Sequence, residues 1–346
     1  MFRLLRLSAA LLFVMTSLIA MPGLSRAAQD ETPTVECVST TPEENEALVQ
    51  AYWDESVWGP QGKIASVVAP DEIHHWGILG TTQGFDEFAK RWALFNAAFP
   101  DLTFQVDEIV ATDTMAASVW TATGTQEGEW QGLPPTHDVV SWSGINIFRI
   151  ACGMIAESWG EADHIGLRAQ LGGTDVPPLM QAAAASPAAG AMAEASPCAP
   201  ATPDETLAVV ERWSNEVWTD RKLEVLDEIA SPEITHHGAS FPDVHGIPDL
   251  QAAVQRQFET FPDLVIAVED GFATSDLAVV RWSGTGTQQG EYFGVPPTGA
   301  DVTMTGINVY RLECGKIVES WSEMNALDVL NAVRKAAAEA EATPAA

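Results

Sequence analysis

The fold is decided by residues 144–159, GINIFRIACGMIAESW, which return at 306–321 as GINVYRLECGKIVESW. The two stretches lie 162 residues apart. The same offset aligns residues 74–163 with 236–325 without a gap, and 34 of these 90 positions are identical. This unit is far longer than a solenoid repeat of roughly 20–50 residues, so each copy is a whole domain with its own core. We expect one domain at residues 37–172 and a second at 201–336.

The segments outside the two copies have distinct compositions. Residues 1–27 resemble a secretory signal peptide, with Arg3 and Arg6 at the start, an apolar run over residues 7–21, and Ser25-Arg26-Ala27 as a small-residue cleavage site. The apolar run is short for a membrane anchor, which needs roughly 20 residues. Residues 173–200 are rich in Ala, Pro, Ser and Gly, a composition typical of a linker. We expect a secreted, extracytoplasmic protein with no membrane association after signal cleavage.

The charge balance excludes one class of partner. The chain carries 17 basic and 48 acidic residues, a formal net charge of −31. Such a surface repels phosphate backbones and anionic headgroups, so we expect no nucleic-acid partner.

Four cysteines follow the repeat. Cys37 and Cys152 bracket the first copy, and Cys198 and Cys314 bracket the second. An even number of cysteines in an exported protein favours disulfides. Of the three possible pairings, Cys37–Cys152 with Cys198–Cys314 is the one that respects the repeat. No short Cys/His spacing typical of zinc is present, so we expect no metal site.

Each copy has an α+β pattern. Capping boxes with a following proline, at Thr41-Pro42-Glu43-Glu44 and Thr202-Pro203-Asp204-Glu205, predict a first helix in each copy that ends near Trp58 and Trp218. In the first copy, a short helical segment at 63–68 and a helix at 85–98 precede strands at 102–110, 115–125, 138–150 and 154–161. We expect two tandem cone-shaped domains, each a curved antiparallel sheet packed against about three helices.

Five tryptophans of the first copy are open to two structural interpretations. They are ordinary core residues, or some of them line an apolar hollow between sheet and helices. They stand at positions Trp92, Trp120, Trp130, Trp142 and Trp159.

These residues resemble a known family. The runs Gly132-Leu133-Pro134-Pro135-Thr136, Gly144-Ile145-Asn146 and Gly153-Met154-Ile155-Ala156-Glu157-Ser158-Trp159, followed by Asp163, are similar to the SnoaL-like polyketide cyclases. These proteins are also called SnoaL-like ester cyclases and belong to the nuclear transport factor two-like superfamily. The resemblance covers nearly all of both copies.

The resemblance implies a cone with a pocket that needs neither metal nor cofactor. It also implies that Asp163 acts as general acid/base in an intramolecular aldol closure, and that His75 lies near the pocket. Physically, an apolar pocket raises the pKa of a carboxyl toward the working pH, where it transfers protons best. His75, His137 and Asn146 are candidate hydrogen-bond donors to a developing oxyanion. Only one of His74 and His75 can face the hollow, because adjacent strand residues point to opposite faces.

Each of these residues also has a structural reading. Asp163 is well placed to cap the helix that follows it. His137 is a candidate solvated loop residue, and Asn146, which recurs as Asn308, is a candidate partner for buried backbone groups.

The second copy departs from the pattern, because Asn325 stands in place of Asp163 and Gly299 in place of His137. An amide cannot remove a proton from carbon at neutral pH, so we expect a degenerate site there. The copy keeps His237, Trp282, Asn308 and Trp321, which leaves ligand binding or stabilisation of the first copy open. Since members of the superfamily often pair through open sheet faces, we expect an intrachain pseudo-dimer.

Three functions compete. The first is a cofactor-independent enzyme of the cyclase, isomerase or hydrolase type that acts on an apolar carbonyl or ester-like molecule through Asp163. The second is an extracellular binding protein for a hydrophobic small molecule, without catalysis. The third is a duplicated structural or interaction module. Export argues against the first function, because polyketide synthesis is normally intracellular, whereas the intact Asp163 argues for it.

Overall fold

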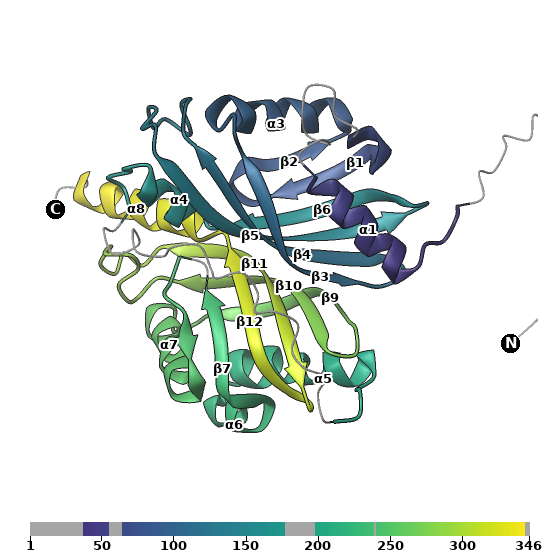
Figure 1. Ribbon diagram of the computed structural model, residues 1–346. Coiled ribbons are helices and arrows are strands. Elements are labelled where there is room, and N and C mark those ends of the chain that lie inside the picture. The colour runs from purple at the N-terminus through teal and green to yellow at the C-terminus, as the bar shows by residue number, and fades with distance from the viewer. Residues whose placement is uncertain (1–36, 55–63, 177–197, 239, 343–346) are drawn as a thin grey trace, which may run out of the picture. The chain divides into compact units, whose positions relative to one another are not determined.

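The computed structural model describes residues 37–54, 64–176, 198–238 and 240–342. The predicted signal peptide at 1–27 and most of the predicted linker lie outside these ranges. By its internal contacts, Cys37–Ala346 is one compact unit. It contains two six-stranded mixed sheets, one in each copy, with helices packed on them, which is the α+β class expected from the sequence (Figure 1). In the described part, no helix is long and apolar enough to span a membrane.

The first sheet has the order β2-β1-β6-β5-β4-β3. The elements of this copy are α1 (Pro42–Tyr52), the 3₁₀ turn η1 (Ile64–Ser66), β1 (Val68–Trp76), the 3₁₀ turn η2 (Gly77–Leu79), β2 (Gly80–Gln83), α3 (Phe85–Ala98), β3 (Thr103–Ala111), β4 (Met115–Thr125), β5 (Val139–Ala151), β6 (Met154–Ala162) and α4 (His164–Gln170).

The second sheet has the equivalent order β8-β7-β12-β11-β10-β9. Its elements are α5 (Pro203–Arg212), the π-helical turn η4 (Trp213–Thr219), the 3₁₀ turn η5 (Leu223–Val225), α6 (Leu226–Ile229), β7 (Ala230–Gly238), β8 (Val244–His245), α7 (Gly246–Thr260), β9 (Val265–Ala273), β10 (Leu277–Thr287), β11 (Asp301–Glu313), β12 (Lys316–Met324) and α8 (Ala326–Ala342).

The predicted capping boxes are present at the start of the first helix in each copy. The hydroxyl of Thr41 accepts from the backbone N–H of Glu44, whose side chain accepts from the N–H of Thr41, and Thr202 and Glu205 repeat this box. The helix predicted at 85–98 is α3. The first helix of copy one ends at Tyr52, several residues before the predicted Trp58, and Trp58 itself lies outside the described residues.

The expected antiparallel sheet is in fact mixed, with one parallel pair of strands in each copy. In each copy the first strand runs parallel to the last one, β1 to β6 and β7 to β12, whereas the other neighbours are antiparallel. A parallel neighbour needs a long connection, and more than 75 residues of helix and strand separate β1 from β6. No local sequence signal reports such a distant pairing.

Both disulfides predicted from the repeat are present, Cys37–Cys152 and Cys198–Cys314. Each ties the segment before the first helix to the turn between the last two strands. Both turns place the cysteine at positive φ, 54° at Cys152 and 52° at Cys314, followed by a glycine at 73°. Two successive positive φ angles are the geometry of a tight type I′ hairpin.

Each sheet buries one face under the helices of its own copy. In copy one, α1 and α3 contribute Val49, Tyr52, Phe88 and Trp92 to a core that also holds Trp120 of β4. In copy two, α5 and α7 cover the equivalent face through Val210, Leu250 and Val254. This face is called the inner face below.

The opposite, outer faces of the two sheets pack against each other. A single buried cluster draws on β3, β4 and β5 of copy one and on β9 to β12 of copy two. Its members are Val110, Ala117, Val119, Ile145, Ile147, Phe272, Val279, Ile307, Val309 and Trp321. Along β5, Ile145 and Ile147 enter this cluster, whereas Phe148 enters the inner core. The strands are therefore apolar on both faces.

Two hydrogen bonds between the copies are equivalent under the offset of 162. Ser143 Oγ donates to Glu323 Oε1 at 2.5 Å, and Thr305 Oγ1 donates to Glu161 Oε1 at 2.7 Å. Equivalent residues exchanged in this way are the mark of an isologous, two-fold contact. Arg311 adds an ion pair to Glu108 across the same contact.

Carboxyl groups are concentrated at this contact. Burial raises the pKa of Glu161 to about 8, even though the bond from Thr305 opposes the rise. Burial, together with the neighbouring Asp163 and Glu161, raises the pKa of Glu323 well above its usual value. Burial also raises the pKa of Asp163. A carboxyl with a raised pKa keeps its proton more tightly in the folded protein than in the unfolded chain.

This pKa shift predicts how stability depends on pH. The contribution of Glu161 is fully present below its usual pKa of 4.5 and is lost as pH rises toward about 8. Each such carboxyl lowers the free energy of unfolding by about 1.4 kcal/mol per pH unit across its window. Urea unfolding at pH 5, 6, 7 and 8 measures this slope, and Glu161→Gln is expected to reduce it.

The control is Glu46→Gln, which removes an exposed glutamate on α1. It is expected to leave the slope at its wild-type value. A Glu161→Gln variant with the full wild-type slope would show that Glu161 does not hold a proton at neutral pH.

Candidate functional site

The second copy contains a cavity of about 390 Å³ between its inner sheet face and the helical elements η4 and α7. Its wall is largely apolar, with Leu250, Val254 and Ile266 among its members, and the indole rings of Trp213 and Trp282 also face it. The volume lies in the range of small-molecule sites.

The cavity lies where the second copy has smaller side chains than the first. At least five inner-face aromatics of copy one correspond to smaller residues in copy two that line the cavity. The two copies align with an offset of 161 in the first helix and 162 afterwards. Five of the aligned pairs are Trp53 and Ser214, Trp76 and Gly238, Trp92 and Val254, Phe104 and Ile266, and Trp142 and Met304.

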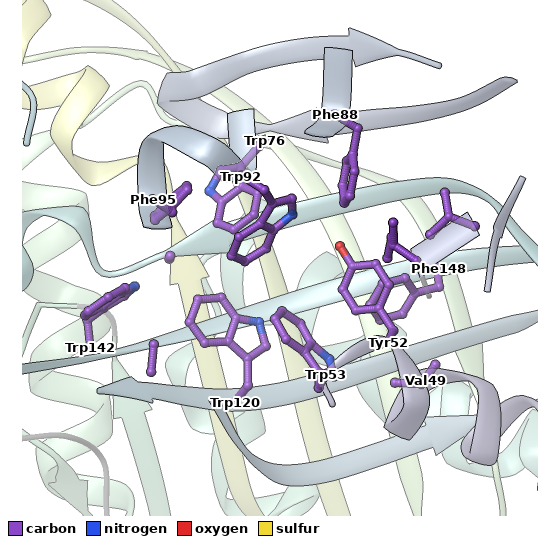
Figure 2. Close-up of a cluster of buried hydrophobic side chains, with 14 of the residues drawn as sticks. Val49, Tyr52, Trp53, Trp76, Phe88, Trp92, Phe95, Trp120, Trp142 and Phe148 are labelled. Atoms are coloured by element: carbon purple, nitrogen blue, oxygen red, sulfur yellow. The ribbon is translucent and has the colours of Figure 1, made fainter. Parts of the chain in front are cut away.

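In the first copy these rings belong to one packed core, and Figure 2 shows four of them, Trp53, Trp76, Trp92 and Trp142. The ring of Trp53 lies 4.8 Å from Phe104 and 5.2 Å from Trp120, between centroids. Trp92 lies 5.7 Å from Phe104 and 6.2 Å from Trp76. These are ordinary distances for aromatic pairs in a core. Trp92, Trp120 and Trp142, expected as possible pocket walls, are core residues of the first copy.

The helix that covers the cavity has an irregular end. After α5, the backbone continues as the π-helical turn η4, which carries the lining residues Trp213, Ser214 and Trp218. An inserted π turn shifts the side chains that follow it relative to a regular helix, and such turns are frequent at functional sites. Ser214 Oγ donates back to Val210 O at 3.3 Å, so its hydroxyl is satisfied within the helix.

The repeated Gly-Ile-Asn run has a structural cause in both copies. Trp120 Nε1 donates to Asn146 Oδ1 at 2.8 Å, and Trp282 Nε1 donates to Asn308 Oδ1 at 2.6 Å. A Cβ at Gly144 would lie 2.0 Å from Cζ2 of Trp120. The glycine therefore lets the indole lie flat on the strand, and the asparagine fixes its orientation. The sequence made both asparagines site candidates, but it did not predict that each accepts a hydrogen bond from a tryptophan indole.

Asn308 and His236 are among the polar residues on the sheet side of the cavity. Because Asn308 Oδ1 accepts from Trp282, its amide N–H groups remain as donors, and they have no hydrogen-bond partner among the described residues. His236 Nδ1 lies 2.9 Å from Ser320 Oγ. Burial, followed by the neighbouring His237, lowers the pKa of His236 to about 4, so the ring is neutral at pH 7.

One replacement between the copies sets the tautomer of this histidine. In copy one, Ser158 Oγ donates to Glu72 Oε1 at 2.6 Å, so it accepts from His74 Nδ1–H. In copy two, Ile234 replaces Glu72. The Ser320 hydroxyl is then free to donate to His236 Nδ1, which favours an Nε2–H on the ring.

Asp163 lies at the contact between the copies. It is the N-cap of α4, and its Oδ1 accepts from Gly166 N at 2.7 Å and from Ser240 Oγ of the second copy. The capping position weighed from the sequence is therefore present. The equivalent Asn325 accepts from Thr305 N at 2.9 Å and is not part of the cavity wall.

The histidine predicted near the pocket lies on the other face. His75 stacks on Trp159 with centroids 5.5 Å apart, and its Nε2 lies 3.1 Å from Glu157 Oε1. The placement of His75 and Trp159 at an inner pocket was wrong. Strand alternation puts them on the outer face, where Arg281 of copy two lies over the Trp159 ring, while His74 is buried inside.

The second copy repeats this arrangement, so His237 also faces outward. It stacks on Trp321 at 5.6 Å and bonds to Glu319 and Asp243. Although burial lowers its pKa, these two carboxylates raise it overall. His137 is an exposed loop residue at positive φ, paired with Glu127 at 2.8 Å. This position is the exposed loop position considered for His137 from the sequence.

Sequence reasoning missed the cavity residues His236, Trp213 and Trp218. The gap-free alignment already contained the signal for the cavity, since it shows five large rings replaced by small residues. It did not show which strand face each one occupies. Among the described residues, no group of three or more His, Cys, Asp or Glu side chains is arranged to hold a metal ion.

Comparison with known proteins gives the family. The family model of the SnoaL-like polyketide cyclases matches residues 47–171 and again 208–333. None of the curated proteins matches the chain.

Several solved structures are similar to one copy each. A SnoaL-like protein of Jannaschia sp. CCS1 is 28% identical, with 41% of this chain and 97% of that one covered and a TM-score of 0.37. IdmH of Streptomyces antibioticus is 27% identical, with 37% and 98% covered and a TM-score of 0.34. TsrD of Streptomyces laurentii is 25% identical, with 38% and 95% covered and a TM-score of 0.35.

The two matches of the family model together span more than half of the chain, in register with the two sheets. The chain therefore belongs to the SnoaL-like polyketide cyclase family and contains two tandem copies of its domain.

Proposed function

We propose that this protein is an exported binding protein for a hydrophobic small molecule, which it holds in the cavity of the second copy. The observation that carries the proposal is the replacement of five inner aromatic rings by Ser214, Gly238, Val254, Ile266 and Met304, all of which line one cavity. An apolar cavity with a few polar groups is the usual form of a small-molecule site.

The lining suggests the chemistry of the ligand. Trp213, Trp218 and Trp282 offer wide apolar surfaces, so an aromatic or polycyclic body fits best. Asn308 and His236 offer N–H donors toward the cavity, which favours a ligand with a carbonyl or ether oxygen. An oxygen that accepts from these donors offsets the cost of burying them.

The acid/base function first considered for Asp163 has little support from its surroundings. Its carboxylate caps α4 and accepts from Ser240, and both contacts fix it at the contact between the copies. It is not part of the wall of the second cavity. In copy one, the inner face beside it is occupied by packed rings.

Catalysis in the second cavity is the other candidate, and one observation favours it. His236 lines the cavity, is neutral at pH 7, and is oriented by Ser320. A neutral imidazole held in this way is able to donate or accept a proton. Under this candidate, the enzyme is cofactor-independent and acts on an apolar carbonyl or ester-like molecule, but with His236 in place of Asp163.

Two further parts of the proposal concern the chain as a whole. We propose export after loss of residues 1–27, which the two disulfides support. We also propose that domains 37–172 and 201–336, joined by the linker at 173–200, act as an intrachain pseudo-dimer. The outer-face cluster and the two equivalent hydrogen bonds support this pairing.

Refilling the cavity tests the binding function. Val254→Trp with Ile266→Phe copies Trp92 and Phe104 of the first copy into the second. The probe is N-phenyl-1-naphthylamine, a neutral apolar fluorophore whose emission rises on binding. The wild-type protein is expected to bind it, and the refilled variant is expected to lose at least about tenfold in affinity, or about 1.4 kcal/mol.

The matched control is Gln255→Trp, which adds the same ring to an exposed position of α7 outside the cavity wall. It is expected to bind the probe like wild type. Equal affinity of the refilled variant and wild type, with both folded by thermal melting, would refute binding in this cavity.

A second pair of variants separates catalysis from binding once a substrate has been found. If turnover occurs in the second cavity, His236→Gln abolishes it and Asp163→Asn preserves it, because the amide oxygen of asparagine keeps both contacts of Asp163. The reverse result, loss with Asp163→Asn alone, would restore the acid/base role of the first copy.

A further inference from the structure

We propose that Asp163 of the first copy is a positioning residue for the cavity of the second copy, where it anchors the wall segment 240–243 through Ser240. The expected effect on ligand affinity rests on the proposed function, because it requires that the cavity binds a small molecule. The aspartate then has a role in shaping the neighbouring copy's site instead of a chemical step in its own.

The anchored segment forms part of the cavity wall. It lies between β7 and β8, and its residues Phe241, Pro242 and Asp243 line the cavity, as does Gly238 at the end of β7. Ser240 precedes them with only 2% of its surface exposed. A shift of Ser240 therefore moves the wall residues that directly follow it.

Ser240 has a backbone conformation that is uncommon for a residue other than glycine. Its φ is +59°, in the left-handed region that serine rarely occupies. Such a conformation persists when neighbouring contacts determine it. The bond from Ser240 Oγ to Asp163 Oδ1 is a contact of this kind, because it links the buried hydroxyl to a charged or strongly polar acceptor.

The acceptor itself is rigidly placed. Asp163 Oδ1 also accepts from Gly166 N at 2.7 Å, which ties the carboxylate to the first turn of α4. That helix packs into the second copy, because Ile165 and Ala169 share a buried cluster with Leu327 and Leu330 of α8. Asp163 and α4 thus belong to the first copy, but α4 packs against α8 of the second copy.

Other contacts hold the far part of the segment. Phe241 stacks on Phe293 with ring centroids 5.1 Å apart, and Asp243 Oδ1 lies 3.0 Å from His237 Nδ1. Ser240 bonds this wall to the first copy. The segment is therefore fixed at both ends, and one of these ends depends on Asp163.

The contact has no equivalent on the other side of the pseudo-two-fold axis. The positions that correspond to Ser240 and Asp163 are Ile78 and Asn325. Isoleucine has no hydroxyl to donate, and Asn325 Oδ1 accepts from Thr305 N. The bond between Asp163 and Ser240 thus reaches the copy that has the cavity. The two copies differ both in the residues that line the cavity and in the residues that form this bond.

Amide hydrogen exchange of the full chain tests the anchor without a ligand. In Ser240→Ala, which leaves the cap of α4 intact, exchange in residues 238–245 is expected to become about three- to tenfold faster, the range set by the loss of one hydrogen bond. Asp163→Ala is expected to give the same local change together with a lower melting temperature from the lost cap. Asp163→Asn keeps an acceptor oxygen and is expected to restore wild-type exchange.

The same variants are then titrated with N-phenyl-1-naphthylamine. Ser240→Ala and Asp163→Ala are expected to bind it about three- to tenfold more weakly than wild type, and Asp163→Asn to match wild type. The matched control is Ser283→Ala, which removes another serine-to-carboxylate bond, to Glu269, outside the cavity wall. It is expected to change neither exchange in 238–245 nor affinity.

Wild-type exchange across residues 238–245 in both Ser240→Ala and Asp163→Ala would overturn the inference, whatever the binding data show. If wild-type protein fails to bind the probe, the proposed function loses its support, and the exchange experiment still decides whether Asp163 anchors the wall.

Discussion

The central strands of this protein must bury both of their faces, and the rest of the structure depends on that constraint. Along β5, Ile145 and Ile147 point into the contact between the sheets, while Asn146 and Phe148 point under the helices. A strand that is apolar on both faces is unstable beside water. One copy by itself would leave the outer face exposed, and the second copy covers it with an equivalent set of side chains. The duplication therefore supplies the second sheet that buries the outer face of the first.

That arrangement allows the two inner faces to diverge. The outer contact maintains the pairing, so the inner core of one copy is able to lose ring volume while the other stays filled. Copy one keeps Trp53, Trp76 and Trp92 packed over Trp120. Copy two keeps only the equivalent of the last one, Trp282, held by Asn308 above Gly306. The inner face of the first copy therefore holds packed rings, and the second copy has the cavity.

Much of the fold could be read from the sequence, for identifiable reasons. Capping boxes at Thr41 and Thr202 set the helix starts, and the repeat selected the disulfide pairing among three alternatives. The parallel pairing of β1 with β6 could not be read, because it joins segments far apart in the chain. The candidate site was predicted less well. Strand alternation required His74 and His75 to face opposite sides, but it did not give the phase, and His74 is the inner one. Asp163 was placed correctly before a helix, whereas its partner Ser240 lies in the other copy and carries no sequence signal.

The central claim is that smaller side chains leave a binding site in the second copy, where packed rings fill the same place in the first. Xenon binding to crystals of the protein under pressure tests it most directly, because xenon enters apolar cavities and needs no knowledge of the ligand. The account predicts xenon density among Val254, Ile266 and Met304. Density between Trp92 and Trp120 of the first copy, with none in the second, would contradict it.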